Sequence, residues 1–393
     1  MRNFRCFIAV LFLFACTISV RAQELTLRAA PIVPGADLIG TYSEFLTHKT
    51  LAVVANQAST VGEKHLVDSL LSMGADVKYI MCPEHGFRGD AEAGAKIKDG
   101  VDAATGIPII SLYGNNKKPR PEQLEGVDAV VFDLQDVGCR FYTYISTLHY
   151  VMEYCAENLI PLLVLDRPNP NAGYVDGPML EEKYKSFVGM HPGVPVVYGM
   201  TIGEYALMIN GEGWLSGGQS CMLTVCRMRN YAHDSVYRLP VPPSPNLRTP
   251  QAIALYPSLC LFEGTNVSVG RGTPWPFEVL GRPSYKAKTF SFVPQPIPGV
   301  SDNPPHRGKR CYGIDLRKET PPASFDLCYL KEMYDNSDKS TFFLKSNFFD
   351  KLAGTAALRQ QLQQGLSVQE IRASWQPGLD KFKQIREKYL LYK

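Results

Sequence analysis

The sequence has no block of like-charged residues and very little net charge. Its 393 residues contain 41 Lys and Arg and 38 Asp and Glu, which leaves a formal net charge of +3 at pH 7. Nucleic-acid-binding proteins usually carry a basic patch, so the charge pattern gives no support for that class. Hydrophobic residues make up 45% of the chain and charged residues 20%, as in an ordinary soluble protein. The length exceeds one compact core and suits two domains.

Several catalytic motifs are also missing. No GxGxxG follows the first expected strand and no Walker loop occurs, which argues against dinucleotide or ATP chemistry. A GxSxG nucleophile elbow and an HExxH zinc helix are absent as well. The cysteines show no disulfide or zinc spacing, and there are no internal repeats. Cys221 and Cys226 are placed to pair across a turn, although buried free thiols are the simpler interpretation.

The only long apolar run lies at the N-terminus. Arg2 and Arg5 precede an apolar stretch over residues 7–20, followed by the small-residue cleavage site at Ala22. This pattern predicts a signal peptide over residues 1–22 and a secreted or periplasmic protein, because the run is short for a bilayer span. Residues 13–16, ending in Cys16, loosely resemble a lipoprotein box, so a lipid anchor stays open.

The first half of the chain alternates strand and helix patterns. Strands that are apolar throughout are expected over residues 51–55, 77–82, 107–112, 129–132 and 161–165. Helices are expected over residues 63–73, 142–157 and 201–208. The third begins at Thr201 with Glu204 three residues on, a reciprocal capping pair. Apolar strands separated by helices predict a doubly wound, Rossmann-like α/β domain with a parallel sheet.

A proline-rich segment at residues 240–245 is the best candidate for a domain boundary, since repeated prolines suit an extended linker. We therefore expect a Rossmann-like catalytic domain over residues 23–240 and a smaller C-terminal α+β domain over residues 241–393. Residues 295–305 are also proline-rich and are expected to form a surface loop.

Polar side chains follow the expected strands where each one ends. In a parallel sheet these ends share one edge, where ligands bind. We therefore predict a functional cleft there. Its candidates are Asn56, Glu84, His85, Arg88, Asp133, Gln135, Asp136, Asp166, Arg167 and Asn169.

Individual roles leave alternatives open. Glu84 suits a general acid, or equally a carboxylate that caps the following turn. Asp133 and Asp136 are spaced to bind a hard cation, but no third acidic ligand or histidine cluster accompanies them, so no metal site is assigned. Arg140 opens a helix and is placed to meet an anion, or to pack as a surface arginine. Asp166 and Arg167 could form a simple ion pair.

Several segments together resemble the exo-β-N-acetylmuramidases, long filed as a domain of unknown function. The matches span roughly residues 50–283, in order. They are Pro83-Glu-His-Gly-Phe-Arg-Gly89, Asp133-Leu-Gln-Asp-Val-Gly138, Arg140-Phe-Tyr-Thr-Tyr144, Leu165-Asp-Arg-Pro-Asn-Pro170, Tyr198-Gly-Met-Thr-Ile-Gly-Glu204, Ser244-Pro-Asn246, Glu263-Gly-Thr-Asn266, Gly270-Arg-Gly-Thr273 and Pro276-Phe-Glu278. Two positions depart from the family pattern. Cys139 stands where alanine is common, and Val269 stands where an acidic residue often precedes Gly-Arg-Gly, which weakens a sugar-binding role there.

The resemblance implies an active site between the two domains, no organic cofactor, and release of N-acetylmuramic acid from the non-reducing end of peptidoglycan fragments, for recycling or scavenging. Glycoside hydrolysis normally uses two carboxyl groups. We expect Glu84 to be the general acid and Asp136 the second carboxylate, with Glu263 and Glu278 in reserve; the substrate's acetamido group could also replace the second.

The remaining implied contacts concern the sugar itself. Arg140 and Arg271 are the candidates for the lactyl carboxylate. Tyr142 and Trp275 could stack on sugar faces, or could equally be core aromatics. Asn246 and Asn266 complete the expected set of binding residues.

Two other classes fit parts of the pattern. A periplasmic sugar-binding protein would also place a cleft between two α/β-like domains. A metal-dependent phosphoester or amide hydrolase would use Asp133 and Asp136. No nucleic-acid partner and no stable membrane span are expected.

Overall fold

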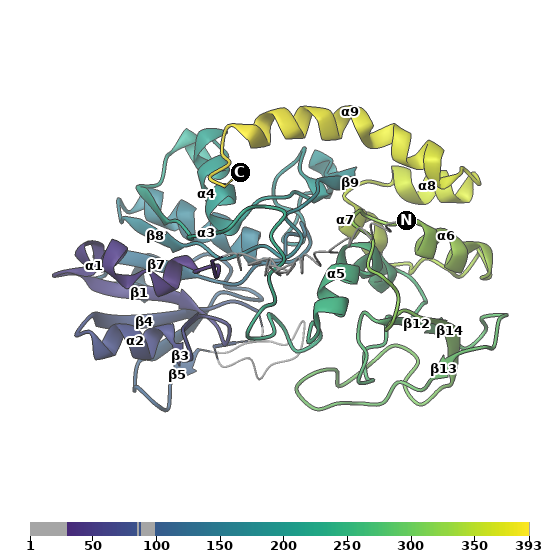
Figure 1. Cartoon of the computed structure of the whole chain (residues 1–393), viewed down its shortest axis with the longest axis horizontal. Coiled ribbons are helices and arrows are strands. Elements are labelled where there is room, and N and C mark those ends of the chain that lie inside the picture. The colour runs from purple at the N-terminus through teal and green to yellow at the C-terminus, as the bar shows by residue number, and fades with distance from the viewer. Residues whose placement is uncertain (1–29, 85, 88–98, 393) are drawn as a thin grey trace, which may run out of the picture. The chain divides into compact units, whose positions relative to one another are not determined.

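The computed structural model describes residues 30–84, 86–87 and 99–392. A seven-stranded sheet with the order β11-β8-β7-β1-β4-β6-β5 organises the first half (Figure 1). Every described neighbour pair in it is parallel except β5 with β6. Its strands are β1 (Thr50–Ala55), β4 (Asp76–Cys82), β5 (Gly100–Val101), β6 (Pro108–Ser111), β7 (Ala129–Asp133), β8 (Leu162–Leu165) and β11 (Leu223–Cys226).

The five predicted strands are confirmed as β1, β4, β6, β7 and β8. Strands β5 and β11 of the sheet were not predicted. β5 has only two residues, both exposed, and β11 mixes buried and exposed residues, so neither shows the apolar run that marked the others. The predicted α/β class is therefore confirmed, with one antiparallel strand at the edge.

Helices cover both faces of this sheet because its strands are apolar on both sides. Successive residues of β1 alternate between two cores: Leu51 and Val53 pack on the side of α1 (Ile39–Leu46) and α2 (Leu66–Ser72). Ala52 and Val54 pack on the side of α3 (Tyr144–Glu157) and α4 (Ile202–Gly211). The capping pair predicted at the start of α4 is present.

The order of the strands positions the site. From β1 the chain runs outward through β4 to β6, then returns to the other side of β1 at β7. Segments that leave the carboxyl ends of β1, β4 and β7 therefore diverge beside this switch point, which is where open α/β sheets bind ligands.

The C-terminal region contains a small antiparallel sheet and helices, as predicted. Its strand order is β12 (Val279–Arg282), β14 (Cys311–Asp315), β13 (Ser291–Phe292). The helices are α5 (Pro250–Leu259), α6 (Cys328–Asp335), α7 (Phe348–Ala353), α8 (Ala357–Gln363) and α9 (Val368–Glu387). The division between residues 240 and 241 stays a prediction.

The proline-rich segment before α5 is held by side chains from the first half. The Nε2 group of Gln57 donates to the carbonyls of Pro242 and Pro243, at 3.0 and 3.2 Å. The hydroxyls of Tyr142 and Tyr144 also donate to Pro243, at 2.8 and 3.4 Å. Prolines offer carbonyls but no N–H, so donor side chains are the natural partners for such a segment.

Shorter elements complete the structure. They are the ribbons β2 (Thr60–Val61) with β3 (Lys64–His65) and β9 (Asp176–Met179) with β10 (Pro195–Val197), and the 3₁₀ turns η1 (Gly35–Asp37), η2 (Pro121–Gln123), η3 (Glu182–Tyr184), η4 (Ser216–Gly218) and η5 (Cys260–Gly264). The helix predicted from residue 63 begins only at Leu66, because the β2–β3 ribbon occupies the residues before it.

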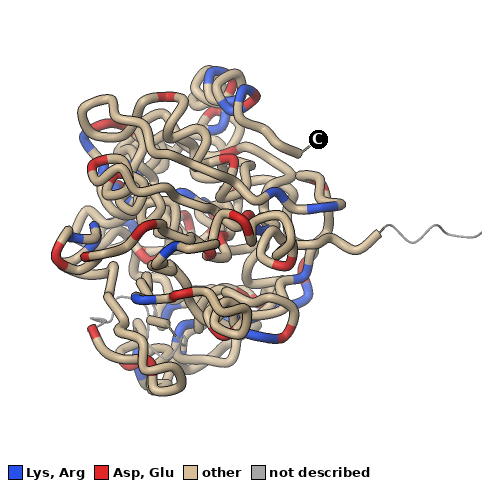
Figure 2. The backbone as a smooth tube through the Cα atoms, turned by 90° about the vertical axis from the view of Figure 1, so that its left-hand side faces the viewer, with Lys and Arg blue, Asp and Glu red and all other residues tan. Residues whose placement is uncertain are grey.

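Surface charge and cysteines match the sequence pattern. Basic and acidic residues are interspersed along the described backbone (Figure 2). In the same part of the chain, no helix combines the length and hydrophobicity of a membrane crossing. The eight described cysteines are free thiols, and Cys226 contacts Thr41 rather than Cys221.

Candidate functional site

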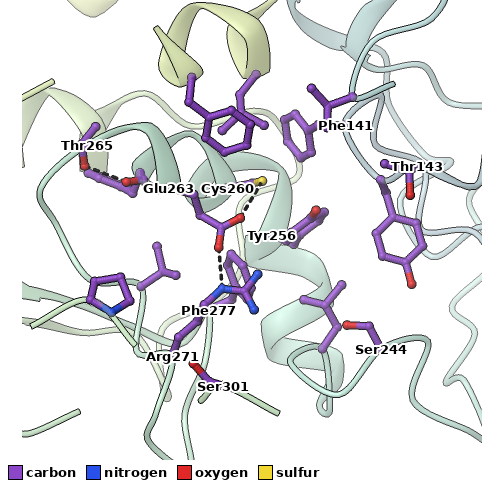
Figure 3. A pocket seen from close by; sticks show the side chains of 18 of the residues that line it. Phe141, Thr143, Ser244, Tyr256, Cys260, Glu263, Thr265, Arg271, Phe277 and Ser301 are labelled. Carbon is purple, nitrogen blue, oxygen red and sulfur yellow. Dashed lines mark hydrogen bonds and ion pairs between the residues drawn. The ribbon is translucent and has the colours of Figure 1, made fainter. Parts of the chain in front are cut away.

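A cavity of about 640 Å³ lies beside the sheet edge. The first half of the chain contributes Glu84, Tyr113, residues 141–144, Phe187 and Val188 to its lining, and the C-terminal region contributes most of the rest. Figure 3 shows Thr143 on one side of this pocket, with Glu263 and Arg271 on the other. Among the described lining residues, Glu84 and Glu263 are the two carboxylates and Arg271 is the one Lys or Arg.

Glu84 follows β4 and lies in the turn closed by the N–H of Gly86 donating to the carbonyl of Pro83, at 3.2 Å. Gly86 has a φ of 76°, in the left-handed region that favours glycine. The hydroxyl of Tyr113 donates to Oε1 of Glu84 at 3.0 Å, and that of Thr143 donates to Oε2 at 3.3 Å. Both oxygens of the half-buried carboxyl group are thereby oriented in the cavity wall.

Glu263 and Arg271 form an ion pair on the opposite side, with 2.5 Å between Oε1 and Nε. The guanidinium also lies 5.2 Å from the ring centroid of Phe277. Burial lowers the pKa of Arg271, but the Glu263 carboxylate outweighs this effect and leaves that pKa raised. The ion pair fixes the guanidinium through its Nε group, and the other guanidinium nitrogens are directed toward the pocket (Figure 3).

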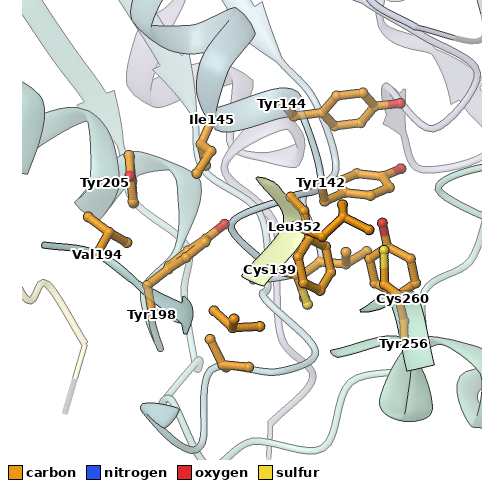
Figure 4. Close-up of a cluster of buried hydrophobic side chains, with 14 of the residues drawn as sticks. Cys139, Tyr142, Tyr144, Ile145, Val194, Tyr198, Tyr205, Tyr256, Cys260 and Leu352 are labelled. Carbon is orange, nitrogen blue, oxygen red and sulfur yellow. The ribbon is translucent and has the colours of Figure 1, made fainter. Parts of the chain in front are cut away.

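Tyrosine rings form the wall next to Glu84. Tyr142 and Tyr144 are packed edge to face with their centroids 4.6 Å apart, and Tyr256 lies 6.0 Å from Tyr142 (Figure 4). Tyr142 lines the cavity, as predicted for a binding residue, but its ring is buried among these neighbours. Asn56 does not line the cavity; its Nδ2 group donates to the hydroxyl of Tyr144 at 2.7 Å and supports that ring from behind.

Asp136 does not line the cavity, contrary to its predicted catalytic role. It is buried, and Oδ2 accepts hydrogen bonds from the hydroxyl of Tyr198 and from the N–H of Gly138, at 2.7 Å for the latter. Burial raises the pKa of Asp136 to about 6. The neighbouring Gln135 is also turned away, because its Nε2 group donates to the carbonyls of Asp136 and Pro168.

Arg140 is a predicted contact of the substrate's lactyl carboxylate, but the structure gives its guanidinium other partners. Its side chain is fully buried and does not line the cavity. The guanidinium donates to four carbonyls, those of Pro178, Val194, Leu352 and Ala353, at 2.7 to 3.1 Å. The last two belong to the C-terminal end of α7, where a cation is favourable. Arg140 therefore ties the β9–β10 ribbon to α7.

The polar residues after β7 and β8 are used for internal contacts. Arg167 forms a bidentate ion pair with Asp133, with 2.7 Å between Nη2 and Oδ2. Asp166 is buried beneath the start of α4 and accepts hydrogen bonds from Thr201 and Tyr392, at 2.7 and 2.6 Å. Asn169 donates to the carbonyl of Met200 at 2.8 Å. None of these residues lines the cavity.

The pairing of Asp133 with Arg167 also removes one of the two carboxylates considered for a cation. Within residues 30–84, 86–87 and 99–392, no group of three His, Cys, Asp or Glu side chains is arranged to hold a metal ion.

Some of the predicted binding residues of the C-terminal region line the cavity, and others do not. Asn266 lines the cavity, and its Oδ1 atom has no hydrogen-bond partner among the described residues. Asn246 lies outside the lining and donates to the carbonyl of Val300 at 2.9 Å. Glu278 lies outside the cavity lining and accepts a hydrogen bond from the hydroxyl of Thr249. The guanidinium carbon of Arg317 lies over the ring of Trp275, 4.3 Å from its centroid. His85 and Arg88 lie outside the described residues.

The structure adds lining residues that the sequence did not single out. Residues 300, 301, 303 and 305 belong to the proline-rich segment that was expected to be a surface loop, and they line the cavity. Phe187 and Val188 enter it from a short turn between β9 and β10. The signal that could have found this turn is its composition, because apolar residues are unusual at the tip of a tight turn.

An aromatic cavity that presents two carboxylates and an arginine, beside the switch point of an α/β sheet, is the kind of site found in a glycoside hydrolase. Comparison with known proteins agrees with this class. Residues 51–251 match the family described as exo-beta-N-acetylmuramidase NamZ, N-terminal, and residues 254–392 match its C-terminal counterpart. The chain belongs to the NamZ exo-β-N-acetylmuramidase family and is a glycoside hydrolase.

Relatives match along almost the whole length. The peptidoglycan beta-N-acetylmuramidase NamZ of Bacillus subtilis (strain 168) is 39% identical over 96% of this chain and 95% of its own length. Two crystal structures of DUF1343 family proteins from Bacteroides fragilis NCTC 9343 share the fold. The first has a TM-score of 0.86 and 44% identity over 93% of this chain and 99% of that chain. The second has a TM-score of 0.79 and 28% identity over 92% of this chain and 99% of that chain.

Proposed function

We propose that this cavity binds the terminal N-acetylmuramic acid residue of peptidoglycan-derived saccharides and that Glu84 protonates the glycosidic oxygen. The observation that carries the proposal is that Thr143, whose hydroxyl binds Glu84, lies across the cavity from the Glu263–Arg271 pair (Figure 3). Cleavage of a terminal muramic acid needs an acid at the glycosidic bond and a cation at the lactyl carboxylate. Glu84 supplies the acid on one side of the cavity, and Arg271 supplies the cation on the other.

Glu84 suits the acid because its carboxyl group has a defined direction. Tyr113 and Thr143 hold one oxygen each, and the group is half-buried in the wall rather than solvated on a loop. General acid catalysis requires the donor within hydrogen-bond reach of the leaving oxygen, so a fixed orientation favours transfer.

The second carboxylate in this proposal is Glu263 rather than Asp136. Glu263 lines the cavity, whereas Asp136 is bonded to Tyr198 outside it. The ion pair with Arg271 fixes the direction of the Glu263 carboxyl group in the cavity wall, and a carboxylate in such a place can stabilise a developing positive charge at the anomeric carbon. The 2-acetamido group of the substrate remains the alternative nucleophile.

Arg271 supplies recognition of the lactyl carboxylate. Its Nε group is engaged by Glu263, and the rest of its planar guanidinium remains available for a carboxylate. A glucosaminide lacks this carboxylate, so the contact separates a muramidase from a general hexosaminidase.

The N-terminal residues support export as part of the same function. The signal-peptide pattern over residues 1–22 supports export to the periplasm or the cell exterior, where peptidoglycan fragments occur. A lipid anchor at Cys16 is the alternative form of the mature protein. Mass spectrometry of the mature N-terminus distinguishes cleavage after residue 22 from acylation.

The test of the proposed function is one comparison of substrates. Mature protein is incubated with a terminal β-N-acetylmuramide and with the matching β-N-acetylglucosaminide, and release of each sugar is quantified. We expect the muramide to be cleaved and the glucosaminide to be cleaved far more slowly. Binding without turnover of either substrate, or equal turnover of both, overturns the proposal.

A further inference from the structure

Next to Glu84 the cavity wall contains half-buried aromatic residues whose rings the proposed chemistry does not use. Tyr113 contacts Glu84 through its hydroxyl, and Phe187 lies next to Tyr113 with 6.0 Å between the ring centroids. Both residues line the cavity and remain partly open to solvent. By contrast, Phe262 and Phe277, which line the C-terminal side, are at most 1% exposed.

Phe187 and Val188 occupy the tip of a two-residue turn. Ser186 and Gly189 exchange backbone hydrogen bonds of 2.8 and 3.0 Å, which closes the turn below them. The hydroxyl of Ser146 on α3 donates to the carbonyl of Phe187 at 2.8 Å and fixes the turn against that helix. Such tips are normally built from Gly, Asn, Asp, Ser or Pro. An apolar pair is therefore unusual at this tip, and three hydrogen bonds fix its backbone in place.

The position of the general acid tells which part of the substrate reaches this wall. A general acid protonates the oxygen between the departing saccharide and the sugar that is released. The muramic acid carboxylate is assigned to Arg271, on the other side of the cavity from Thr143, the residue whose hydroxyl binds Glu84. The groups beyond Glu84 therefore face the departing saccharide.

We infer that Tyr113, Phe187 and Val188 form a subsite for the departing saccharide, an inference that rests on the proposed function. Aromatic rings provide flat apolar surface for the C–H faces of a sugar. The ammonium of Lys117 lies over the Phe187 ring, 4.8 Å from its centroid, and offers hydrogen-bond donors for sugar hydroxyls. The occupant is a neutral amino-sugar ring, the residue to which a terminal muramic acid is linked.

Phe187→Ala in the full mature chain tests this subsite with two substrates. One is N-acetylmuramic acid β-linked to a second amino sugar, and the other is the methyl β-glycoside of N-acetylmuramic acid. Both leaving groups are alkoxides and need the same protonation, so they differ mainly in what occupies the subsite. We expect kcat/KM for the disaccharide to fall about three- to tenfold, and kcat/KM for the methyl glycoside to stay within about twofold.

Two further variants keep the test decisive. Tyr184→Ala changes a half-buried aromatic residue three positions earlier that does not line the cavity, and it should leave both substrates unaffected. Phe187→Leu keeps apolar bulk without the ring and should repeat the selective loss even if Phe187→Ala is poorly folded. Equal losses on both substrates in the leucine variant would overturn the subsite. If wild-type protein cleaves neither substrate, the proposed function itself fails.

Discussion

Glu263 and Arg271 are eight residues apart in the sequence, and their side chains form an ion pair of 2.5 Å in the wall of the cavity. The ion pair holds the side chain of Arg271 in one orientation. Because a guanidinium has five N–H donors, it can still donate hydrogen bonds to a substrate. This relationship places a fixed cation opposite Glu84, and it provides the first of four predictions.

Arg271→Ala should remove the preference for muramic acid. A charge-assisted hydrogen bond contributes about 1.5–3 kcal/mol, so discrimination between muramide and glucosaminide should fall by roughly one to two decades. Steady-state kcat/KM on the two substrates measures this ratio. Arg317→Ala is the matched control, because Arg317 pairs with Asp315 and does not line the cavity. An unchanged ratio in Arg271→Ala would show that another group reads the carboxylate.

Glu84→Gln should keep the fold and substrate binding and lose most turnover. Proton transfer by a positioned acid contributes roughly 10²–10⁴-fold, and the amide cannot supply that proton. The loss is measured as kcat on a muramyl disaccharide, whose alkoxide leaving group requires protonation. Glu181→Gln, an exposed carboxylate outside the cavity, is the control. A Glu84→Gln enzyme within about threefold of wild type contradicts the assignment.

Arg140→Met should destabilise the protein. Methionine fills much of the same apolar space but removes the arginine donor from the carbonyls of Pro178, Leu352 and Ala353, whereas the carbonyl of Val194 keeps the N–H of Leu180. Each unsatisfied buried group costs about 1–3 kcal/mol, so the free energy of unfolding should fall by at least about 3 kcal/mol. Denaturant unfolding measures the change, and Arg140→Lys, which restores some donors, should recover part of it. If Arg140→Met is as stable as wild type and its preference for the muramide is altered, Arg140 binds the substrate and the structural role is wrong.

Asp136→Asn should change how stability depends on pH. The pKa of Asp136 is raised from 3.8 to about 6, so between these values the folded protein holds a proton that the unfolded chain has released. This contribution to stability is complete below about pH 4 and is lost as the pH rises through 6. Relative to Asp136→Asn, wild-type protein should lose about 3 kcal/mol across that window. Denaturant unfolding at pH 4, 5, 6 and 7 checks this, and parallel curves for the two proteins would contradict it.

Much of the fold and part of the site could be predicted from local pattern. Apolar runs ending in polar residues identified the strands of the parallel sheet, because a strand covered on both faces must be apolar throughout. The motif around Glu84 and the segments of residues 263–266 and 270–273 each supply at least one residue that lines the cavity. Strands β5 and β11 were missed since neither carries that run.

The partners of each polar residue were decided only by tertiary structure. Asp166 and Arg140 show the same sequence signals as Glu84, at a strand end or a helix start. Chain segments far away bind them: Tyr392 reaches Asp166, and the carbonyls of Leu352 and Ala353 reach Arg140. Phe187 gives the opposite case, an apolar residue in a loop that the fold brings to the cavity. Local sequence determines which elements form because backbone and side-chain preferences are local. Which polar group faces substrate depends on contacts between residues up to 226 positions apart, and these form only when the chain is folded.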